Sequence, residues 1–229
     1  MKASECAKVI VALRSASNPE WKQSMSKFGV NTDNALGLSV PFLRSMAKTI
    51  GINHNLAQEL WSSGIHEARI LATMIDDPSL VTEKQMGRWA SDMDSWDICD
   101  SCCGNLFDRT RFAYKKAKEW AKADHEFTKR AGFAIMAALA VHDKTANDGL
   151  FIGFFPCIVN AADDERNFVK KAVNWSLRNI GKRNLTLNKA AIRVATQIKS
   201  MDSRSARWIA SDALRELRSP AVAARLRAR

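Results

Sequence analysis

The sequence has 229 residues, of which 46% are hydrophobic and 26% charged, and it carries a formal net charge of +11 at pH 7. This composition is typical of a folded chain, and the length supports one large core or two smaller ones. No run approaches the roughly 18 uninterrupted apolar residues of a membrane span, and residues 1–6 lack the apolar core of a signal peptide, so we expect a cytoplasmic protein with no membrane partner.

The first half of the sequence predicts a series of short helices. Its hydrophobic residues follow the 3.6-residue helical period, without the sustained alternation that is typical of strands. Ser4 and Ser39 are candidate N-caps, and Pro41 suits the first turn of the second of these helices. Thr82 and Gln85 form a capping box. We predict helices over residues 4–13, 21–28, 39–50, 55–62, 65–75 and 82–90.

The second half continues the same pattern. Here the sequence predicts helices over residues 107–123, 126–141, 150–161 and 165–180, one capped by Thr186 or Asn188 that ends at Ile198, and one from Ser203 to Leu217 that stops at the Ser219-Pro220 break. Short helices in antiparallel pairs of about 40 residues are typical of an α-solenoid of HEAT-like repeats. We therefore predict an all-α superhelix with a concave basic face, formed as a single domain over residues 1–229.

The positive charge is concentrated in the second half of the chain. Residues 1–108 contain 10 Lys and Arg against 13 Asp and Glu, whereas residues 109–229 contain 25 against 11. A basic excess of this size attracts a phosphate backbone and supplies sequence-independent affinity. Solubility or contact with an acidic protein would explain the same excess, so charge alone leaves the partner open.

The five cysteines indicate thiols rather than disulfides, because their number is odd and the chain has no export signal. Cys99 and Cys102 have C-x-x-C spacing, next to Cys103. A structural zinc site normally needs four ligands, and no second C-x-x-C or paired histidine follows. We expect no metal and interpret these cysteines as small hydrophobic residues within a helix.

The stretch from Asp94 to Asp100 places aromatic and acidic side chains at helical spacing. Asp94 or Ser95 is a candidate N-cap, and Trp96 and Asp100 are four residues apart, so that both project from one side of the helix. The positive end of the helix dipole favours ionised carboxylates in the first turn. An indole face beside a carboxylate suits a cation that develops in a transition state. The alternative is a core tryptophan in an ordinary capped first turn.

A second stretch, from Asp163 to Arg178, combines a tryptophan with basic residues. Trp175 shares a helix face with Phe168, while Lys170, Lys171 and Arg178 mark a basic flank. This combination can hold an aromatic ring at the edge of a phosphate-binding channel. An amphipathic helix with a core tryptophan and solvated lysines would give the same pattern.

Four stretches together resemble the landmarks of bacterial AlkD-type DNA alkylation repair glycosylases, in the order found in that family. They are Gly37-Leu-Ser-Val-Pro41-Phe-Leu-Arg44, Ser95-Trp-Asp-Ile-Cys-Asp100, Lys129-Arg130 at the start of an apolar helix, and Lys170-Lys-Ala-Val-Asn-Trp175-Ser-Leu-Arg178. The resemblance covers roughly residues 20–200. It implies a solenoid of HEAT-like repeats in the bacterial cytoplasm that wraps duplex DNA and releases cationic alkylated purines, such as N3-methyladenine and N7-methylguanine.

The resemblance also implies roles for single residues. Trp96 and Trp175 match the two tryptophans at the lesion, Asp100 matches the catalytic carboxylate, and Arg130 matches an arginine that contacts DNA. Asp97 lies in the same motif and is a candidate supporting acid. The predicted DNA contacts are Arg130, Lys170, Lys171 and Arg178. Two features depart from the family: residues 149–155 resemble an insertion, and Phe28 is only a candidate for a further lesion-side aromatic near the N-terminus.

The implied reaction is hydrolysis of an N-glycosidic bond by a monomer without a metal or organic cofactor. An alkylated purine is already cationic and leaves without protonation, so the enzyme must stabilise positive charge on the deoxyribose. The sequence contains neither a G-x-S-x-G nucleophile elbow nor a phosphate-binding P-loop. The main alternative is a catalytically inactive helical-repeat protein that binds nucleic acid or an acidic protein through its basic face. Base release distinguishes the two.

Overall fold

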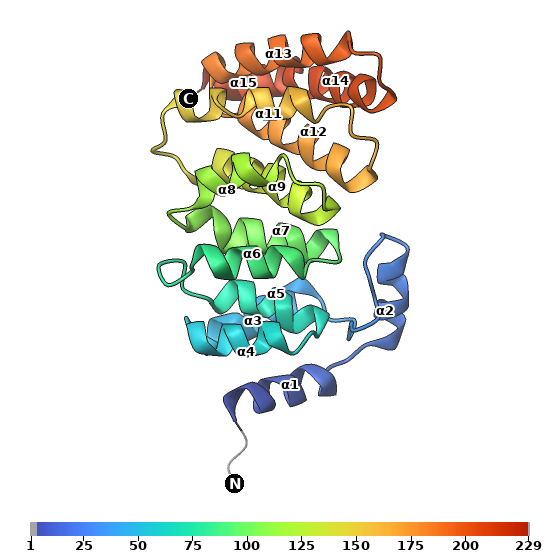
Figure 1. Cartoon of the computed structure of the whole chain (residues 1–229), viewed down its shortest axis with the longest axis vertical. Coiled ribbons are helices and arrows are strands. Elements are labelled where there is room, and N and C mark those ends of the chain that lie inside the picture. The colour runs from blue at the N-terminus through green and yellow to red at the C-terminus, as the bar shows by residue number, and fades with distance from the viewer. Residues whose placement is uncertain (1–3, 229) are drawn as a thin grey trace. The chain divides into compact units, whose positions relative to one another are not determined.

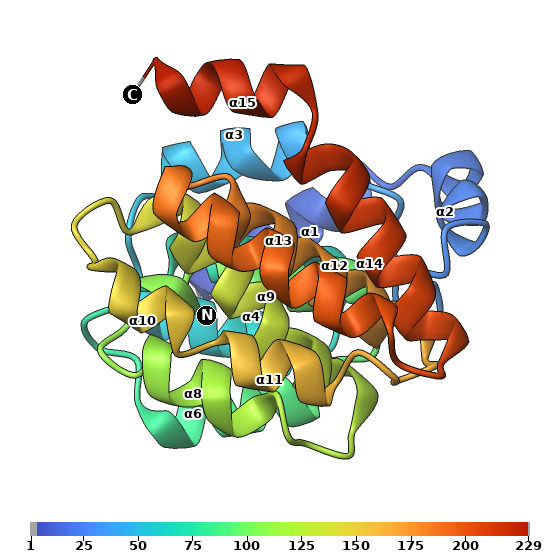
Figure 2. The ribbon, with the colours of Figure 1, turned by 90° about the horizontal axis from the view of Figure 1, so that it is seen from above.

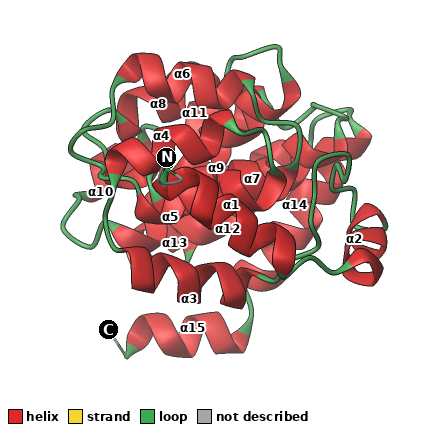
Figure 3. Ribbon diagram, turned by 90° about the horizontal axis from the view of Figure 1, so that it is seen from below, coloured by secondary structure: helices red, strands yellow, loops and turns green. Residues whose placement is uncertain are grey.

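The regular structure of the protein is entirely helical (Figure 3). The computed structural model describes residues 4–228, and in this range no strand is present, which confirms the all-α prediction. None of the helices in the described range combines the length and the apolar character needed to span a bilayer. The chain divides into two compact units, unit 1 (Met1–Arg111) and unit 2 (Phe112–Arg229).

Unit 1 consists of short helices joined by turns and, between α2 and α3, by a longer loop over residues 27–39 (Figure 1). They are α1 (Glu5–Ser15), α2 (Pro19–Ser26), α3 (Val40–Ile50), α4 (His54–Ser62), α5 (His66–Ile75), α6 (Glu83–Ser91), α7 (Trp96–Asn105) and the 3-10 helix η1 (Phe107–Arg109). Helix α5 packs against α3, α4 and α7.

Three helix starts in unit 1 that the sequence predicted by capping are confirmed. Ser4, Ser39 and Thr82 each accept a backbone N–H from the residue three positions later, at 3.2, 3.4 and 3.1 Å. The capping box is only half formed, because the Gln85 amide donates to the Asp76 carboxylate at 2.6 Å instead of returning to the cap. A long-range bond to a buried acid has therefore replaced the local one.

A stack of large side chains forms the core between α4 and α6. The rings of Trp61 and Trp89 are nearly parallel, with centroids 4.0 Å apart and an angle of 2° between their planes. The Arg69 guanidinium lies 5.3 Å from the Trp61 ring centroid, and the Phe107 ring centroid lies 6.3 Å from that of Trp89. Such aromatic pairs add about 0.5 to 1.5 kcal/mol each beyond the area that they bury.

The buried carboxylate of Glu67 anchors the loop that precedes α3. Its side chain is 0% exposed and accepts the backbone N–H groups of Leu36, Gly37 and Leu38 at 2.8, 2.7 and 3.1 Å. Gly37 has a φ of +78°, and a Cβ there would lie 2.1 Å from the Asn18 carbonyl oxygen at the start of α2. Only glycine fits this close approach, so Glu67 and Gly37 together set the position of α2.

Unit 2 continues as helix pairs, with α13 and α14 side by side in Figure 2. Its helices are α8 (Ala113–Trp120), α9 (Glu126–His142), α10 (Asp148–Ile152), α11 (Phe155–Asn160), α12 (Asn167–Gly181), α13 (Leu185–Lys199), α14 (Arg204–Leu217) and α15 (Pro220–Arg227).

Helices α9 and α12 form the centre of unit 2. The two pack against each other; α9 also contacts α8, and α12 contacts α13 and α14. The alanine-rich middle of α9 is buried, and a Cβ on Gly132 would lie 2.5 Å from the backbone nitrogen of Ala121 at the end of α8. Small residues on α9 therefore let neighbouring backbones approach closely.

In unit 2 one predicted helix start is wrong, and the predicted break at Ser219-Pro220 is confirmed. The helix predicted to start at Thr186 or Asn188 begins after Asn184, whose side chain accepts the Leu187 N–H at 2.9 Å. The Ser219-Pro220 pair ends α14 but also begins α15, with Ser219 as N-cap and proline in the first turn.

Two predicted single helices are interrupted. The predicted helix over residues 107–123 is broken after η1, where the Thr110 hydroxyl donates to the Phe107 carbonyl at 2.8 Å and the backbone turns extended. The predicted helix over residues 150–161 divides into α10 and α11. Phe151 in α10 and Phe154 between the two helices are buried, and the Tyr114 ring stacks on Phe154 with centroids 5.8 Å apart. The segment expected as an insertion thus contributes aromatic core to unit 2.

We predict that Glu67→Gln lowers the free energy of unfolding by about 1 to 3 kcal/mol. The glutamine amide presents an NH2 group where a carboxylate oxygen accepted an N–H, so at least one buried backbone donor loses its acceptor. Chemical denaturation measures the change. The exposed Glu59→Gln serves as control and should stay within about 0.5 kcal/mol of wild type; equal effects of the two substitutions would contradict the anchoring role.

Candidate functional site

The start of α7 is held by a loop that is distant in sequence. Ser95 is the N-cap residue, but its hydroxyl makes no bond within the helix and accepts the backbone N–H of Asn31 at 2.7 Å. The Asn31 amide donates to the Asp94 carboxylate at 2.9 Å. The two residues that the sequence offered as local caps therefore connect α7 to the loop between α2 and α3.

Trp96, the first residue of α7, is half-buried and fixed by its indole N–H. The Nε1 atom donates to the carbonyl oxygen of Phe28 at 3.0 Å. The Phe28 ring itself is 68% exposed. This hydrogen bond places the backbone of Phe28 at the edge of the Trp96 ring and orients the indole without covering it with a second aromatic ring.

Asp97 faces a buried histidine that sequence reasoning missed. Its Oδ2 atom lies 2.8 Å from Nε2 of His66, the first residue of α5, and its Oδ1 accepts the Ile98 N–H at 3.0 Å. His66 is 3% exposed. Burial alone would lower the pKa of His66, but the hydrogen bond and charge of Asp97, together with Glu67 and Asp94, outweigh burial and raise it. A lone histidine after Gly64 carries no sequence signal for this pairing.

Asp100 follows Trp96 by one helical turn, so both side chains project from the same side of α7. Its side chain is half-buried. The neighbouring thiols of Cys102 and Cys103 are fully buried, and burial raises their pKa values well above the usual range. They are protonated and serve as core. Among residues 4–228 no group of three or more His, Cys, Asp or Glu side chains is arranged to hold a metal ion.

Arg130 is a buried residue at the start of α9 rather than a surface cation. It is 6% exposed, and its Nη1 atom donates to the carbonyl oxygen of Phe168 in α12 at 2.7 Å. The rings of Phe127 and Phe168 pack with centroids 5.6 Å apart beside this bond. Arg130 thus ties α9 to the first turn of α12.

The preceding lysine belongs to the same connection. The Lys129 ammonium pairs with Asp164 at 2.9 Å, and Arg166 pairs with the same carboxylate at 2.6 Å. Burial would raise the pKa of Asp164, but its hydrogen bonds to Arg166 and Lys129 outweigh burial and lower it strongly. The basic residues at the start of α9 therefore stabilise unit 2 internally.

The three predicted DNA contacts on α12 have different surroundings. The Arg178 guanidinium forms ion pairs with Glu216 and, at 3.1 Å, with Asp212, both on α14. The Lys170 ammonium lies 5.8 Å from the ring of the half-exposed Trp208, and Lys171 is exposed. Of the three, Arg178 already has carboxylate partners within the protein.

Trp175 lies in the middle of α12 and is half-buried. Its neighbour Asn174 is buried and donates to Asp212 at 2.7 Å, and Ser176 is also buried. Trp175 is therefore flanked by residues that face the interior of unit 2 while part of its own ring remains accessible.

The structure places Trp96, Asp97 and Asp100 together on α7 of unit 1, and Arg130, Lys170, Lys171, Trp175 and Arg178 on α9 and α12 of unit 2.

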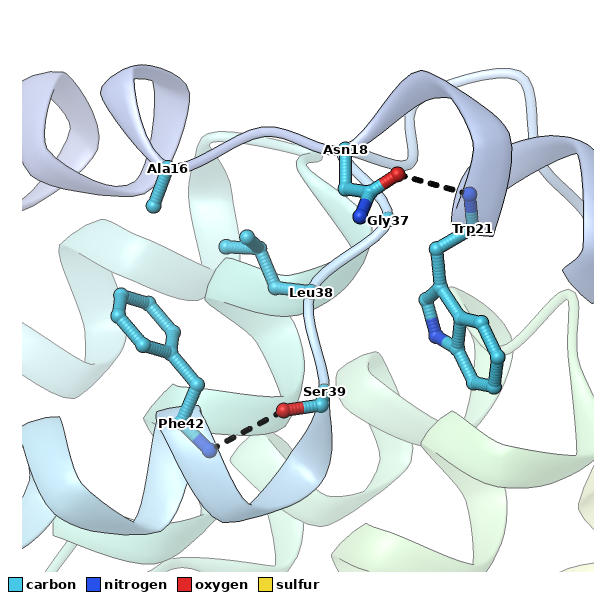
Figure 4. Close-up of a pocket in the computed structure, with 7 residues that line it drawn as sticks. All are labelled: Ala16, Asn18, Trp21, Gly37, Leu38, Ser39 and Phe42. Carbon is cyan, nitrogen blue, oxygen red and sulfur yellow. Dashed lines mark hydrogen bonds between the residues drawn. The ribbon is translucent and has the colours of Figure 1, made fainter.

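A pocket of about 350 Å³ opens between the starts of α2 and α3 (Figure 4). Asn18 and Ser39 at its rim cap these two helices. The rings of Trp21, 50% exposed, and Phe42, 37% exposed, line it from the two helices. Neither Trp96 nor Asp100 lines this pocket, so it is separate from the site that the sequence predicted.

Comparison with known proteins gives a family and a fold. The sequence profile of the family described as "DNA alkylation repair enzyme" matches residues 9–217. A search of curated proteins finds no similar sequence. One solved structure aligns with a TM-score of 0.76 at 18% identity, over 93% of this chain and 95% of that chain; it is described as "a new family of proteins related to the HEAT-like repeat DNA glycosylases with affinity for branched DNA structures".

That alignment shows the fold, an α-solenoid of HEAT-like repeats, and confirms the predicted fold class. Two further solved structures are less similar. An engineered protein aligns with a TM-score of 0.38 at 14% identity over 77% of this chain and 90% of that chain, and a designed armadillo repeat protein with 0.35 at 15% identity over 76% and 91%.

We predict that the pairing of His66 with Asp97 makes stability depend on pH. The pKa of His66 is raised in the folded state, so the stabilisation is complete below its unfolded value of about 6.5 and is lost as the pH rises through the folded value. At pH 6, His66→Gln should lower the free energy of unfolding by about 1.5 to 3 kcal/mol.

Unfolding measured at several pH values tests this sign. The difference between wild type and His66→Gln should shrink toward pH 8.5, and Asp97→Asn should remove most of that pH dependence. A difference that grows with pH would refute the charged pairing.

Proposed function

The chain belongs to the family of DNA alkylation repair enzymes, and on this premise we propose that it is a base-excision glycosylase. The proposed reaction is hydrolysis of the N-glycosidic bond that joins a cationic alkylated purine, such as N3-methyladenine or N7-methylguanine, to duplex DNA. The observation that carries the proposal is the pairing of Trp96 and Asp100 on one side of α7, with the indole oriented by Phe28 and its ring left partly accessible.

Asp100 is the proposed catalytic carboxylate. As the glycosidic bond lengthens, positive charge develops on the deoxyribose, and a carboxylate about 4 Å away in an effective dielectric near 20 would stabilise it by up to roughly 4 kcal/mol. This corresponds to about three orders of magnitude in rate. The same carboxylate can orient the water that attacks the sugar. The purine leaves as a neutral base, because it carried the positive charge before the bond broke.

Trp96 in unit 1 and Trp175 in unit 2 are each proposed to present an aromatic face to a cationic nucleotide. Each face would contribute about 0.5 to 2 kcal/mol of cation–π stabilisation. Asp97 takes a supporting role, because its hydrogen bond to His66 connects the first turn of α7 to α5. Phe28 positions Trp96 through its backbone carbonyl.

Unit 2 is the proposed DNA-binding half, because it contains 23 Lys and Arg against 11 Asp and Glu. We propose that Lys170 and Lys171 contact phosphates. Arg130 and Arg178 instead act mainly by positioning α12, since their guanidinium groups bond to Phe168 and to the acids of α14. Monomeric binding to duplex DNA is part of this proposal.

A second function deserves a direct test because of the similar fold described as having "affinity for branched DNA structures". The second candidate function is therefore DNA binding without base release. The retained Trp96, Asp100 and Trp175 favour the glycosylase, and release of free base from methylated DNA distinguishes the two functions.

We predict that Asp100→Asn reduces base release by on the order of a hundredfold or more while DNA affinity changes little. Asparagine retains the shape of aspartate but removes the negative charge, so an interaction made only in the transition state is lost. Single-turnover release of N7-methylguanine, with enzyme in excess, measures the rate. A binding isotherm on unmodified duplex measures affinity.

Two outcomes would decide against parts of the proposal. If wild type releases base and Asp100→Asn does so within about twofold of the same rate, the carboxylate mechanism is wrong. If wild type itself releases no base but binds DNA, the protein is a non-enzymatic DNA-binding member of its fold.

A further inference from the structure

A second basic site lies in unit 2, at the C-terminal ends of α9 and α12. Four cationic side chains line one pocket of about 250 Å³: Lys144, Lys182, Arg183 and Arg225. They come from the loop after α9, the end of α12 and helix α15, so the folding of unit 2 gathers them from three segments. The volume corresponds to on the order of eight water molecules at about 30 Å³ each, which is enough for a phosphodiester group.

Two of these cations are fixed in place by protein contacts. Arg183 donates to the carbonyl oxygens of Ala140 and Ala146 at 3.1 and 3.2 Å, and its guanidinium lies 4.1 Å from the Phe151 ring centroid. Lys182 pairs with Glu216 at 2.9 Å. These contacts hold the inner wall of the pocket in one arrangement before any ligand binds, which lowers the entropic cost of binding.

The other two cations are exposed at the rim of the pocket. Among residues 4–228, neither Lys144 nor Arg225 has an ion-pair partner. The loop that carries Lys144 is ordered by Asp143, whose carboxylate accepts hydrogen bonds from Thr145, Ala146 and the Tyr114 hydroxyl at 2.9 to 3.1 Å. The acid next to Lys144 is therefore engaged by neutral donors.

The pocket shares one face of α12 with Trp175. Asn179, which lines the pocket, follows Trp175 by four residues, and Lys182 follows it by seven. At about 1.5 Å per residue, Lys182 lies about 10 Å from Trp175 along the helix axis. This distance equals the axial rise of about three base pairs of duplex DNA, at about 3.4 Å each.

We propose that this pocket binds a phosphate group of the DNA backbone near the nucleotide that contacts Trp175. The chemistry recognised is a phosphate oxyanion, for which converging Lys and Arg side chains provide charge-assisted hydrogen bonds. The exposed Val141 beside the cations gives an apolar surface for the adjoining sugar. This assignment rests on the proposed function only in placing DNA on unit 2, and it holds for undamaged DNA as well.

The test is a pair of charge-matched double variants. Lys144→Gln with Arg225→Gln removes two positive charges from the pocket. Lys189→Gln with Arg227→Gln removes two exposed charges from α13 and α15 that do not line it. Affinity for an unmodified duplex is measured at several salt concentrations. The pocket variant should lose about tenfold in affinity and about one unit of log–log salt slope, while the control stays within about twofold.

Equal losses in the two variants, at unchanged melting temperature, would overturn the site. Duplexes in which single phosphates are replaced by neutral methylphosphonates give a second measurement. One linkage should weaken binding by wild type but not by the pocket variant, and the absence of any such linkage would overturn the DNA backbone as the ligand.

Inorganic phosphate alone is the third probe. If it binds wild type but not the pocket variant, while no methylphosphonate position has an effect, the pocket takes free phosphate and the DNA assignment is wrong. Because these measurements use undamaged DNA, failure of base release in the glycosylase assay would leave them unaffected.

Discussion

The position of the candidate catalytic side chains depends on hydrogen bonds that join the start of α7 to the loop after α2. The Ser95 hydroxyl accepts the Asn31 N–H, and the Trp96 indole donates to the Phe28 carbonyl. The same region of chain is anchored by Glu67, which binds the backbone near Gly37. A buried carboxylate on α5 therefore determines, through one loop, how the indole and carboxylate of α7 are presented. Burying that carboxylate is tolerable because it receives three N–H donors.

Features controlled by neighbouring residues could be predicted from sequence, whereas features controlled by distant ones could not. The caps Ser4, Ser39 and Thr82 act within one helical turn, so the local residue pattern was enough to predict these helix starts. The same reasoning failed at Asn184, because Thr186 and Asn188 had the right chemistry and only the packing of α13 selects among the three. The contact of His66 with Asp97 spans 31 residues and left no local signal. For the candidate site, the sequence indicated the residue types on α7 but not the distant contacts that fix their side chains.

The net charge of unit 2 overestimates the number of cations that are available to bind a phosphate. Lys129, Arg130 and Arg178 have partners inside the protein, in part because a helical repeat must join each helix pair to the next. An Arg–carboxylate pair fixes the orientation of the guanidinium as well as balancing its charge. Because the charge is already balanced, the arginine attracts an external anion less strongly. Lys144 in a loop and Arg225 near a helix end have no ion-pair partner among the described residues. Cations without carboxylate partners among the described residues are therefore the ones that we propose as the main phosphate contacts.

The two acids in the first turns of α7 differ in their electrostatic surroundings. Asp97 and Asp100 are three residues apart, close enough for like charges on one helix to repel. The hydrogen bond and charge of Asp97 raise the pKa of His66 despite its burial, and the protonated imidazole offsets part of the Asp97 charge. That compensation reduces the repulsion that the Asp97 carboxylate exerts on the carboxylate of Asp100. The proposed chemistry needs a negative charge at Asp100 before positive charge appears on the sugar, and weaker repulsion from Asp97 favours that charge. The buried histidine thus lowers the electrostatic cost of placing a second acid one turn along the helix.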